Sequence, residues 1–203
     1  MWMKDSKVIL CTGGIGSGKS YVARAFDAMG IPSYDTDSAA KALYDTDAVL
    51  LAEVAEIAGR DVVKDGKLDR SALAARIFSD KAMLERLEAV VHPAVIRDFN
   101  RWKSARESEI VLIESAIMLE KPVFKGLADY VLAVSAPLEM RITRAMRRDG
   151  ATRGAVLERI SRQWTDAERE AVADFVIIAD ERHQIVPEIV KIIETVKNGK
   201  DRS

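Results

Sequence analysis

A glycine-rich octapeptide near the N-terminus limits the fold of this chain more than any other feature. Residues 13–20 read GGIGSGKS and fit the pattern G-x-x-x-x-G-K-[ST]. An apolar run at 8–11, typical of a buried parallel strand, precedes them, and residues 21–29 follow with apolar side chains at helical spacing. A strand, a glycine loop and a helix in this order predict a phosphate-binding loop in an α/β fold, rather than a glycine-rich turn that binds nothing.

The residue types of this loop suit a nucleoside triphosphate. Glycines let successive backbone N–H groups turn inward around phosphate oxygens, and the following helix adds its positive N-terminal end. Lys19 is expected to reach the β- and γ-phosphates, and Ser20 to hold Mg²⁺ through its hydroxyl. The residues predicted to bind ATP are Gly13, Gly14, Ile15, Gly16, Ser17, Gly18, Lys19, Ser20 and Tyr21.

Several other short apolar runs resemble the strand at 8–11. They lie at 32–34, 110–113, 130–134 and 175–178. Their separation requires crossover helices, which predicts a parallel β-sheet sandwiched by helices in a single domain. We expect the core of this domain to comprise about 1–36, 107–137 and 170–203, ending in a helix near 187–196.

Two segments interrupt this core. Residues about 37–106 are rich in Ala, Leu, Glu, Lys and Arg with few turn signals, which predicts a mostly helical insertion. Residues about 138–169 carry one apolar helix face and many arginines, and Asp149-Gly150 reads as a hinge or turn after which Thr152 can cap the next helix. We interpret this second segment as a helical lid.

Composition favours a small-molecule partner. Charged residues make up 31% of the 203, but the net charge is only −1, so we expect no binding to nucleic acid or membranes. One cysteine, Cys11, excludes an internal disulfide framework and reads as a small buried residue. The apolar run at 8–11 is too short for a signal sequence or a span. We expect a cytoplasmic protein that is a monomer or a weak homo-oligomer.

Acidic residues follow two of the expected strands. Asp35 and Asp37 come directly after the strand at 32–34, whose end lies on the same sheet edge as the phosphate loop. One could accept the proton of an attacking hydroxyl and the other could position magnesium through water, although Asp37 could instead cap a helix that begins near Ser38. Glu114 ends the strand at 110–113 and could serve the magnesium shell; it, like Glu120, could equally be an ordinary exposed acid.

The lid arginines and the histidines leave further alternatives open. Arginines between Arg141 and Arg162 suit the charge of a triphosphate, yet a solvated helix face would look the same. His92 precedes Pro93, which marks a helix boundary, so this histidine could be purely structural. The chain has only two histidines, which supports neither a zinc triad nor a serine-type catalytic triad.

Motifs beyond the phosphate loop make the whole chain resemble the bacterial dephospho-CoA kinase family. That family's G-[IV]-P…D-A-D resembles 30–32 with 35–37, its insertion resembles 66–70 and 91–93, and its lid patterns R-x-x-x-x-x-x-R-D and R-I-x-x-Q resemble 141–149 and 159–163. The family's D-x-P-L-L-F-E stretch is ESAIMLE here, at 114–120, which loses the first aspartate and the proline. Tyr21, Lys41 and Ala179 also depart from the family's usual residues.

The resemblance implies a reaction and a set of roles. ATP would phosphorylate the ribose 3′-hydroxyl of dephospho-CoA, the last step of coenzyme A synthesis. Asp37 would be the base, Lys19, Arg141 and Arg148 would stabilise charge, and Asp35, Asp37 and His92 would bind the acceptor in and beside a helical lobe. Mg²⁺ would be held by Ser20 and Glu114.

Two rival functions share the phosphate loop. One is a related kinase of the adenylate, shikimate or nucleoside type, which would use another acceptor. The other is a regulatory nucleotide switch or ATP-binding module without an acceptor. An N-K-x-D guanine-reading motif is absent from the sequence, and a switch would not need an acidic pair beside the γ-phosphate.

Overall fold

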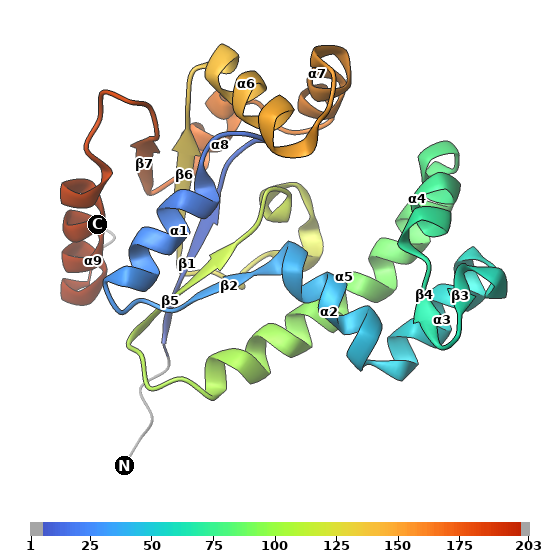
Figure 1. The fold of residues 1–203 in the computed structure, drawn as a ribbon. Coiled ribbons are helices and arrows are strands. Elements are labelled where there is room, and N and C mark those ends of the chain that lie inside the picture. Colours follow the sequence, from blue (N-terminus) through green and yellow to red (C-terminus); the bar gives the residue numbers. More distant parts are fainter. Residues whose placement is uncertain (1–5, 200–203) are drawn as a thin grey trace. The chain divides into compact units, whose positions relative to one another are not determined.

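The computed structural model describes residues 6–199, apart from the side chains at 78 and 79. These residues form two compact units, which are described separately (Figure 1). One unit contains residues 6–35 and 107–199, and the other is Thr36–Arg106. The division of a single domain into a core, a helical insertion and a lid stays a prediction.

A five-stranded parallel sheet organises the first unit, with the strand order β2-β5-β1-β6-β7. The predicted strands are all confirmed, with ends that differ by at most one residue. Their bounds are β1 (Lys7–Thr12), β2 (Ser33–Asp35), β5 (Ile110–Glu114), β6 (Tyr130–Ser135) and β7 (Phe175–Ile178). The central position of β1 explains why residues 8–11 are all apolar and buried, since strands in the middle of a parallel sheet are covered on both faces.

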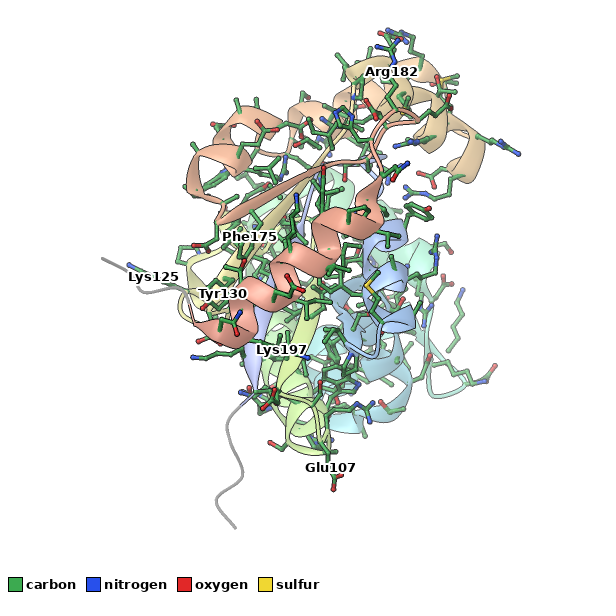
Figure 2. All side chains as sticks on the ribbon, turned by 90° about the vertical axis from the view of Figure 1, so that its left-hand side faces the viewer. Glu107, Lys125, Tyr130, Phe175, Arg182 and Lys197 are labelled. Atoms are coloured by element: carbon green, nitrogen blue, oxygen red, sulfur yellow. The ribbon has the colours of Figure 1, made fainter. Side chains whose placement is uncertain are left out.

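Helices α1 (Lys19–Ala28) and α9 (Ile185–Asn198) cover one face of this sheet (Figure 1). The apolar residues of α9 recur every three or four positions and join the sheet in a single core. Figure 2 looks onto α9 and labels Tyr130 of β6 and Phe175 of β7. The centroids of these two rings are 5.9 Å apart. Cys11 is fully buried in this core, as predicted. The sheet with its helices confirms the α/β prediction.

The segment predicted as a lid is helical. It contains α6 (Leu138–Asp149), α7 (Arg153–Ser161) and α8 (Asp166–Val172). Gly150, with φ of 64°, ends α6, which confirms the turn after Asp149. Thr152 accepts a hydrogen bond from the N–H of Ala155, which confirms the predicted cap of α7. Two short 3₁₀ helices, η2 (Met118–Glu120) and η3 (Pro122–Phe124), follow β5.

The second unit is mostly helical, as predicted, but it also contains a hairpin that we did not predict. Its elements are α2 (Thr36–Thr46), α3 (Ala48–Ala58), η1 (Arg60–Val62), β3 (Val63–Lys64), β4 (Lys67–Leu68), α4 (Arg70–Ser79) and α5 (Lys81–Ser104). The hairpin turn is Asp65-Gly66, with φ of 51° and 74°. This Asp-Gly pair is a known hairpin signal.

Two sequence interpretations are wrong. Pro93 marks no helix boundary, because it lies inside α5, a helix of 24 residues. The packing of α2, α3 and α4 against α5 outweighs the tendency of proline to end a helix. Asp37 is not a helix cap, because α2 begins at Thr36, two residues before the predicted start at Ser38, which places Asp37 in the first turn of the helix. Within residues 6–199, no helix is long and apolar enough to span a membrane.

Candidate functional site

The glycine loop joins β1 to α1 at the carboxyl edge of the sheet. Gly16 and Gly18 have φ of 74° and 99°, a backbone region that other residues rarely adopt. A Cβ on Gly16 would lie 2.1 Å from the carbonyl oxygen of Arg141. The loop therefore closes directly against α6, and glycine is required there for space as well as for conformation.

The start of α1 supplies donors to this loop. Lys19 and Ser20 are its first two residues, so their backbone N–H groups have no partner within the helix. Such groups, together with the positive end of the helix, form an anion site. The predicted phosphate cradle therefore has the backbone that its chemistry requires.

The structure brings together the two residues that the sequence proposed as magnesium ligands. The Oγ of Ser20 donates a hydrogen bond to Oε1 of Glu114 over 2.6 Å. Glu114 is only 6% exposed and pairs in register with both Cys11 and Asp35 on the neighbouring strands. The phosphate loop, Glu114 and Asp35 thus share one edge of the sheet.

The donors at this edge fit magnesium. A hydroxyl and a carboxylate are hard oxygen ligands, and in nucleotide sites phosphates and water complete the shell. Among the described residues, no three His, Cys, Asp or Glu side chains form a metal cluster. Burial, and secondarily the charge of Glu114, raises the pKa of the Cys11 thiol well above its usual range, so Cys11 is no candidate ligand.

A cavity of about 670 Å³ adjoins the end of the loop. Its lining includes Gly18 and Tyr21, the lid residue Arg144, and residues 179, 180 and 183–187. Arg144 closes one side by donating from Nη1 to the carbonyl of Ala179 over 2.8 Å. This volume next to a phosphate cradle suits the base and ribose of a nucleotide.

Sequence reasoning counted Arg144 among the lid arginines without singling it out, and it missed the segment after Ala179. In that segment Oδ1 of Asp180 accepts hydrogen bonds from the backbone N–H groups of Arg182 and His183 and contacts Nδ1 of His183 at 2.8 Å. The His183 side chain is the main reason why the pKa of Asp180 falls to about 2. The one sequence signal was Ala179, which stands in place of the family's usual asparagine.

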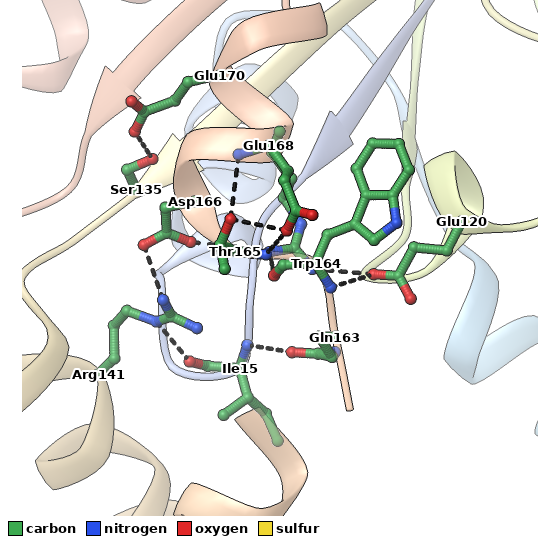
Figure 3. Close-up of polar contacts among 11 residues, drawn as sticks. Ile15, Glu120, Ser135, Arg141, Gln163, Trp164, Thr165, Asp166, Glu168 and Glu170 are labelled. Atoms are coloured by element: carbon green, nitrogen blue, oxygen red, sulfur yellow. Dashed lines mark hydrogen bonds and ion pairs between the residues drawn. The ribbon is translucent and has the colours of Figure 1, made fainter. Parts of the chain in front are cut away.

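The two predicted lid arginines lie in different surroundings. Arg141 is 5% exposed; its Nε donates to the carbonyl of Ile15 over 3.1 Å and its Nη1 contacts Asp166 at 2.7 Å (Figure 3). Arg148 is half exposed and forms a bidentate pair with Asp149, at 2.6 and 2.9 Å. Arg148, followed by Arg159, holds the pKa of Asp149 well below its usual range. Arg148 would have to leave Asp149 to reach a nucleotide.

The remaining predicted residues are divided between the two units. Asp37 lies in the first turn of α2, and His92 lies within α5 beside Pro93. Asp35 ends β2 in the first unit, where its side chain is exposed. The roles of these three residues in proton transfer and acceptor binding stay predictions.

Comparison with known proteins finds relatives that match this chain across the phosphate loop, the sheet and the lid segment. Residues 7–184 match the family model for dephospho-CoA kinase. The chain is 42% identical to dephospho-CoA kinase of Porphyromonas gingivalis over 190 residues, which are 93% of this chain and 94% of that protein. It is 38% identical to dephospho-CoA kinase of Bacteroides fragilis over 183 residues, which are 90% and 89% of the two chains.

Solved structures extend this similarity. A crystal structure of a Thermus thermophilus protein superposes with a TM-score of 0.84 at 34% identity, covering 97% of this chain and all of that one. Shikimate kinase of Acinetobacter baumannii shares the fold alone, with a TM-score of 0.53, 15% identity and 98% coverage of both chains. The match of the family model to residues 7–184 and the 42% identity over nearly the full length lead to one conclusion: the chain belongs to the dephospho-CoA kinase family.

Proposed function

We propose that this chain transfers the γ-phosphoryl group of ATP to the ribose 3′-hydroxyl of dephospho-CoA, which gives ADP and coenzyme A. One observation carries the proposal: the family match spans residues 7–184, a range that includes the phosphate loop, the helical insertion and the lid. This reaction is the last step of coenzyme A synthesis.

The phosphate loop and Lys19 bind and orient the triphosphate. The N–H groups at the start of α1 contact phosphate oxygens, and the Lys19 ammonium offsets the charge that spreads over the transferred group. Tyr21 and the cavity beside it hold the base and ribose. Phosphoryl transfer needs mainly alignment and charge neutralisation, and this half of the site supplies both.

Ser20 and Glu114 hold magnesium at the loop. Their oxygens are already 2.6 Å apart, so one ion and its water shell can engage both. Magnesium, when bound, neutralises the β- and γ-phosphate oxygens. Glu114 extends further than the aspartate usual in this family, and its bond to the Ser20 hydroxyl shows that the longer side chain still reaches the loop.

Asp37 acts as the general base for the acceptor hydroxyl, and Asp35 and His92 help to bind the acceptor. Their family positions support these roles, together with the place of Asp35 beside Glu114 at the sheet edge. Arg141 and Arg148 contribute positive charge from the lid, and a closed lid excludes water that would otherwise take the phosphoryl group. We also propose that the protein works in the cytoplasm. We propose that it is a monomer or a weak homo-oligomer, and gel filtration checks this oligomeric state.

Three acceptors offered separately with ATP and magnesium test the proposal. Dephospho-CoA should give ADP and coenzyme A, identified by mass, whereas AMP and shikimate should give no phosphorylated product. Turnover of AMP or shikimate alone would move the chain to another kinase reaction.

The base is tested by Asp37→Asn. This change should lower kcat by about 10²- to 10⁴-fold, because the base acts in the transition state, and should leave ATP affinity nearly unchanged. Asp45→Asn is the matched control, since Asp45 lies in the same helix and forms an exposed ion pair with Arg70. An unaltered kcat in Asp37→Asn would transfer the role to Asp35 or Glu114.

A further inference from the structure

Two side chains of the lid segment form hydrogen bonds to the backbone of Ile15 in the phosphate loop. The N–H of Ile15 donates to Oε1 of Gln163 over 2.9 Å, and its carbonyl accepts from Nε of Arg141 over 3.1 Å (Figure 3). These partners lie 148 and 126 residues further along the chain. The Ile15 side chain is 8% exposed and packs with Ile142 and other apolar lid residues. Backbone and side chain of Ile15 are thus both fixed by the lid segment.

Arg141 is itself held by a buried set of charges. Asp166 accepts from its Nη1 at 2.7 Å and lies 3.8 Å from Nη1 of Arg169, so this carboxylate stands between two guanidinium groups. Arg169 is 1% exposed and pairs with Glu120 at 3.1 Å. A buried guanidinium keeps its place only where carboxylates compensate it. Asp166 therefore fixes the orientation in which Arg141 meets the loop.

This arrangement has a consequence for nucleotide binding. Four of the eight loop residues are glycines, which lose more conformational freedom on ordering than other residues. A loop that is already ordered binds phosphate without that cost. The bond to Gln163 also occupies the Ile15 N–H, which leaves the donors at the start of α1 for phosphate.

We propose that Gln163 and Asp166 are positioning residues, which hold the phosphate loop in its binding conformation before the nucleotide enters. Gln163 acts directly on Ile15, and Asp166 acts through Arg141. The inference rests on the proposed function only in taking ATP as the ligand of the loop. Neither residue touches the reacting atoms, so their removal should weaken binding of phosphate groups rather than the chemical step.

Calorimetric titration with ADP and with adenosine tests this. Gln163→Met keeps the length of the side chain and removes the acceptor, and should weaken ADP binding about tenfold, near the upper limit for one hydrogen bond. Adenosine, which has no phosphate, should bind as it does to the wild type. In turnover, the KM of Gln163→Met for ATP should rise while its kcat is retained. Asp166→Asn should likewise weaken ADP binding and raise the KM for ATP.

Glu168→Ala is the matched control. Glu168 belongs to the capping box of α8, two residues from Asp166, and its carboxylate accepts hydrogen bonds from the backbone N–H and the hydroxyl of Thr165. Its loss lowers stability in the same segment and should leave ADP affinity at the wild-type value. A general loss of folded protein would reduce the number of binding sites in either variant without changing Kd.

Amide exchange of Ile15 in the nucleotide-free protein gives a second readout, which needs no activity. The Ile15 N–H should exchange slowly in the wild type and at least about tenfold faster in Gln163→Met. Unchanged ADP affinity in Gln163→Met, or an unprotected Ile15 amide in the wild type, would overturn the inference. Failure of the proposed function looks different, since dephospho-CoA would then not be phosphorylated although ADP binding still depended on Gln163.

Discussion

Glu120→Gln should destabilise the protein strongly, although Glu120 lies outside the sheet core. The change keeps the size of the side chain and an acceptor oxygen but removes the charge that faces Arg169 over 3.1 Å. Burial lowers the pKa of Arg169, and Glu120 and then Asp166 raise it again. The buried guanidinium of Arg169 would be left with Asp166, at 3.8 Å, as its remaining carboxylate partner in this network of described residues.

The magnitude follows from this geometry. Breaking a buried ion pair costs about 3–5 kcal/mol, and the Asp166 carboxylate that remains places this case near about 3 kcal/mol. In a chain of 203 residues, each kcal/mol shifts Tm by about 2–4 °C, so we expect Tm to fall by about 6–12 °C. Arg169→Met in the Glu120→Gln background should recover part of this loss, because the uncompensated charge is then gone.

Thermal unfolding followed by circular dichroism measures the effect. Glu158→Gln is the control, because Glu158 pairs with Arg162 on an exposed helix face, where an ion pair contributes about 0–1 kcal/mol. If Glu120→Gln shifted Tm no more than Glu158→Gln does, Arg169 would not be desolvated, and the buried charges could not position Arg141.

Two further predictions concern the nucleotide side of the site. Glu114→Gln should raise the magnesium concentration for half-maximal turnover by about 10- to 100-fold, because Glu114 orients the Ser20 hydroxyl; an unchanged magnesium requirement would remove Glu114 from the shell. His183→Ala should raise the pKa of Asp180 from about 2 toward the ordinary value of 3.8. Because the folded-state pKa of Asp180 is lowered, the stabilisation that its carboxylate gives is present above pH 3.8 and is lost as the pH falls toward 2. The carboxyl ¹³C shift of Asp180 should therefore titrate at a higher pH in His183→Ala than in the wild type. Identical titration curves in the two proteins would refute the role of His183.

The sequence predicted those parts of the fold that depend on local pattern. Buried parallel strands read as continuous apolar runs, and the glycine loop between β1 and α1 has a backbone that few other residues could adopt. The meeting of Ser20 and Glu114 also followed from pattern, because carboxyl ends of parallel strands share one sheet edge.

The errors arose where tertiary contacts outweigh local preference. Pro93 lies inside α5 because three other helices pack along this long helix. The hairpin at β3 and β4 was missed although Asp65-Gly66 carries a recognised turn signal, since the surrounding composition is typical of helices. Asp37 shows the usual uncertainty of a helix end, where a shift of two residues separates a cap from a first-turn acid.

The contacts of the lid could not be read from the sequence. Arg141, Arg144 and Arg148 look alike in the sequence, yet Arg141 is buried against Ile15, Arg144 lines the cavity beside Tyr21 and Arg148 pairs with Asp149. Each difference depends on a partner that only the fold brings near. Gln163 could be matched to a family pattern, but its bond to Ile15 spans 148 residues.

Phosphorus NMR of the complete reaction tests the central claim most directly. With ATP, magnesium and dephospho-CoA, the spectrum should show a new phosphomonoester on the ribose 3′-oxygen, formed in equal amount with ADP. ADP that appears with inorganic phosphate and without this ester would contradict the proposed reaction, as would transfer of the phosphoryl group to any other oxygen of the acceptor.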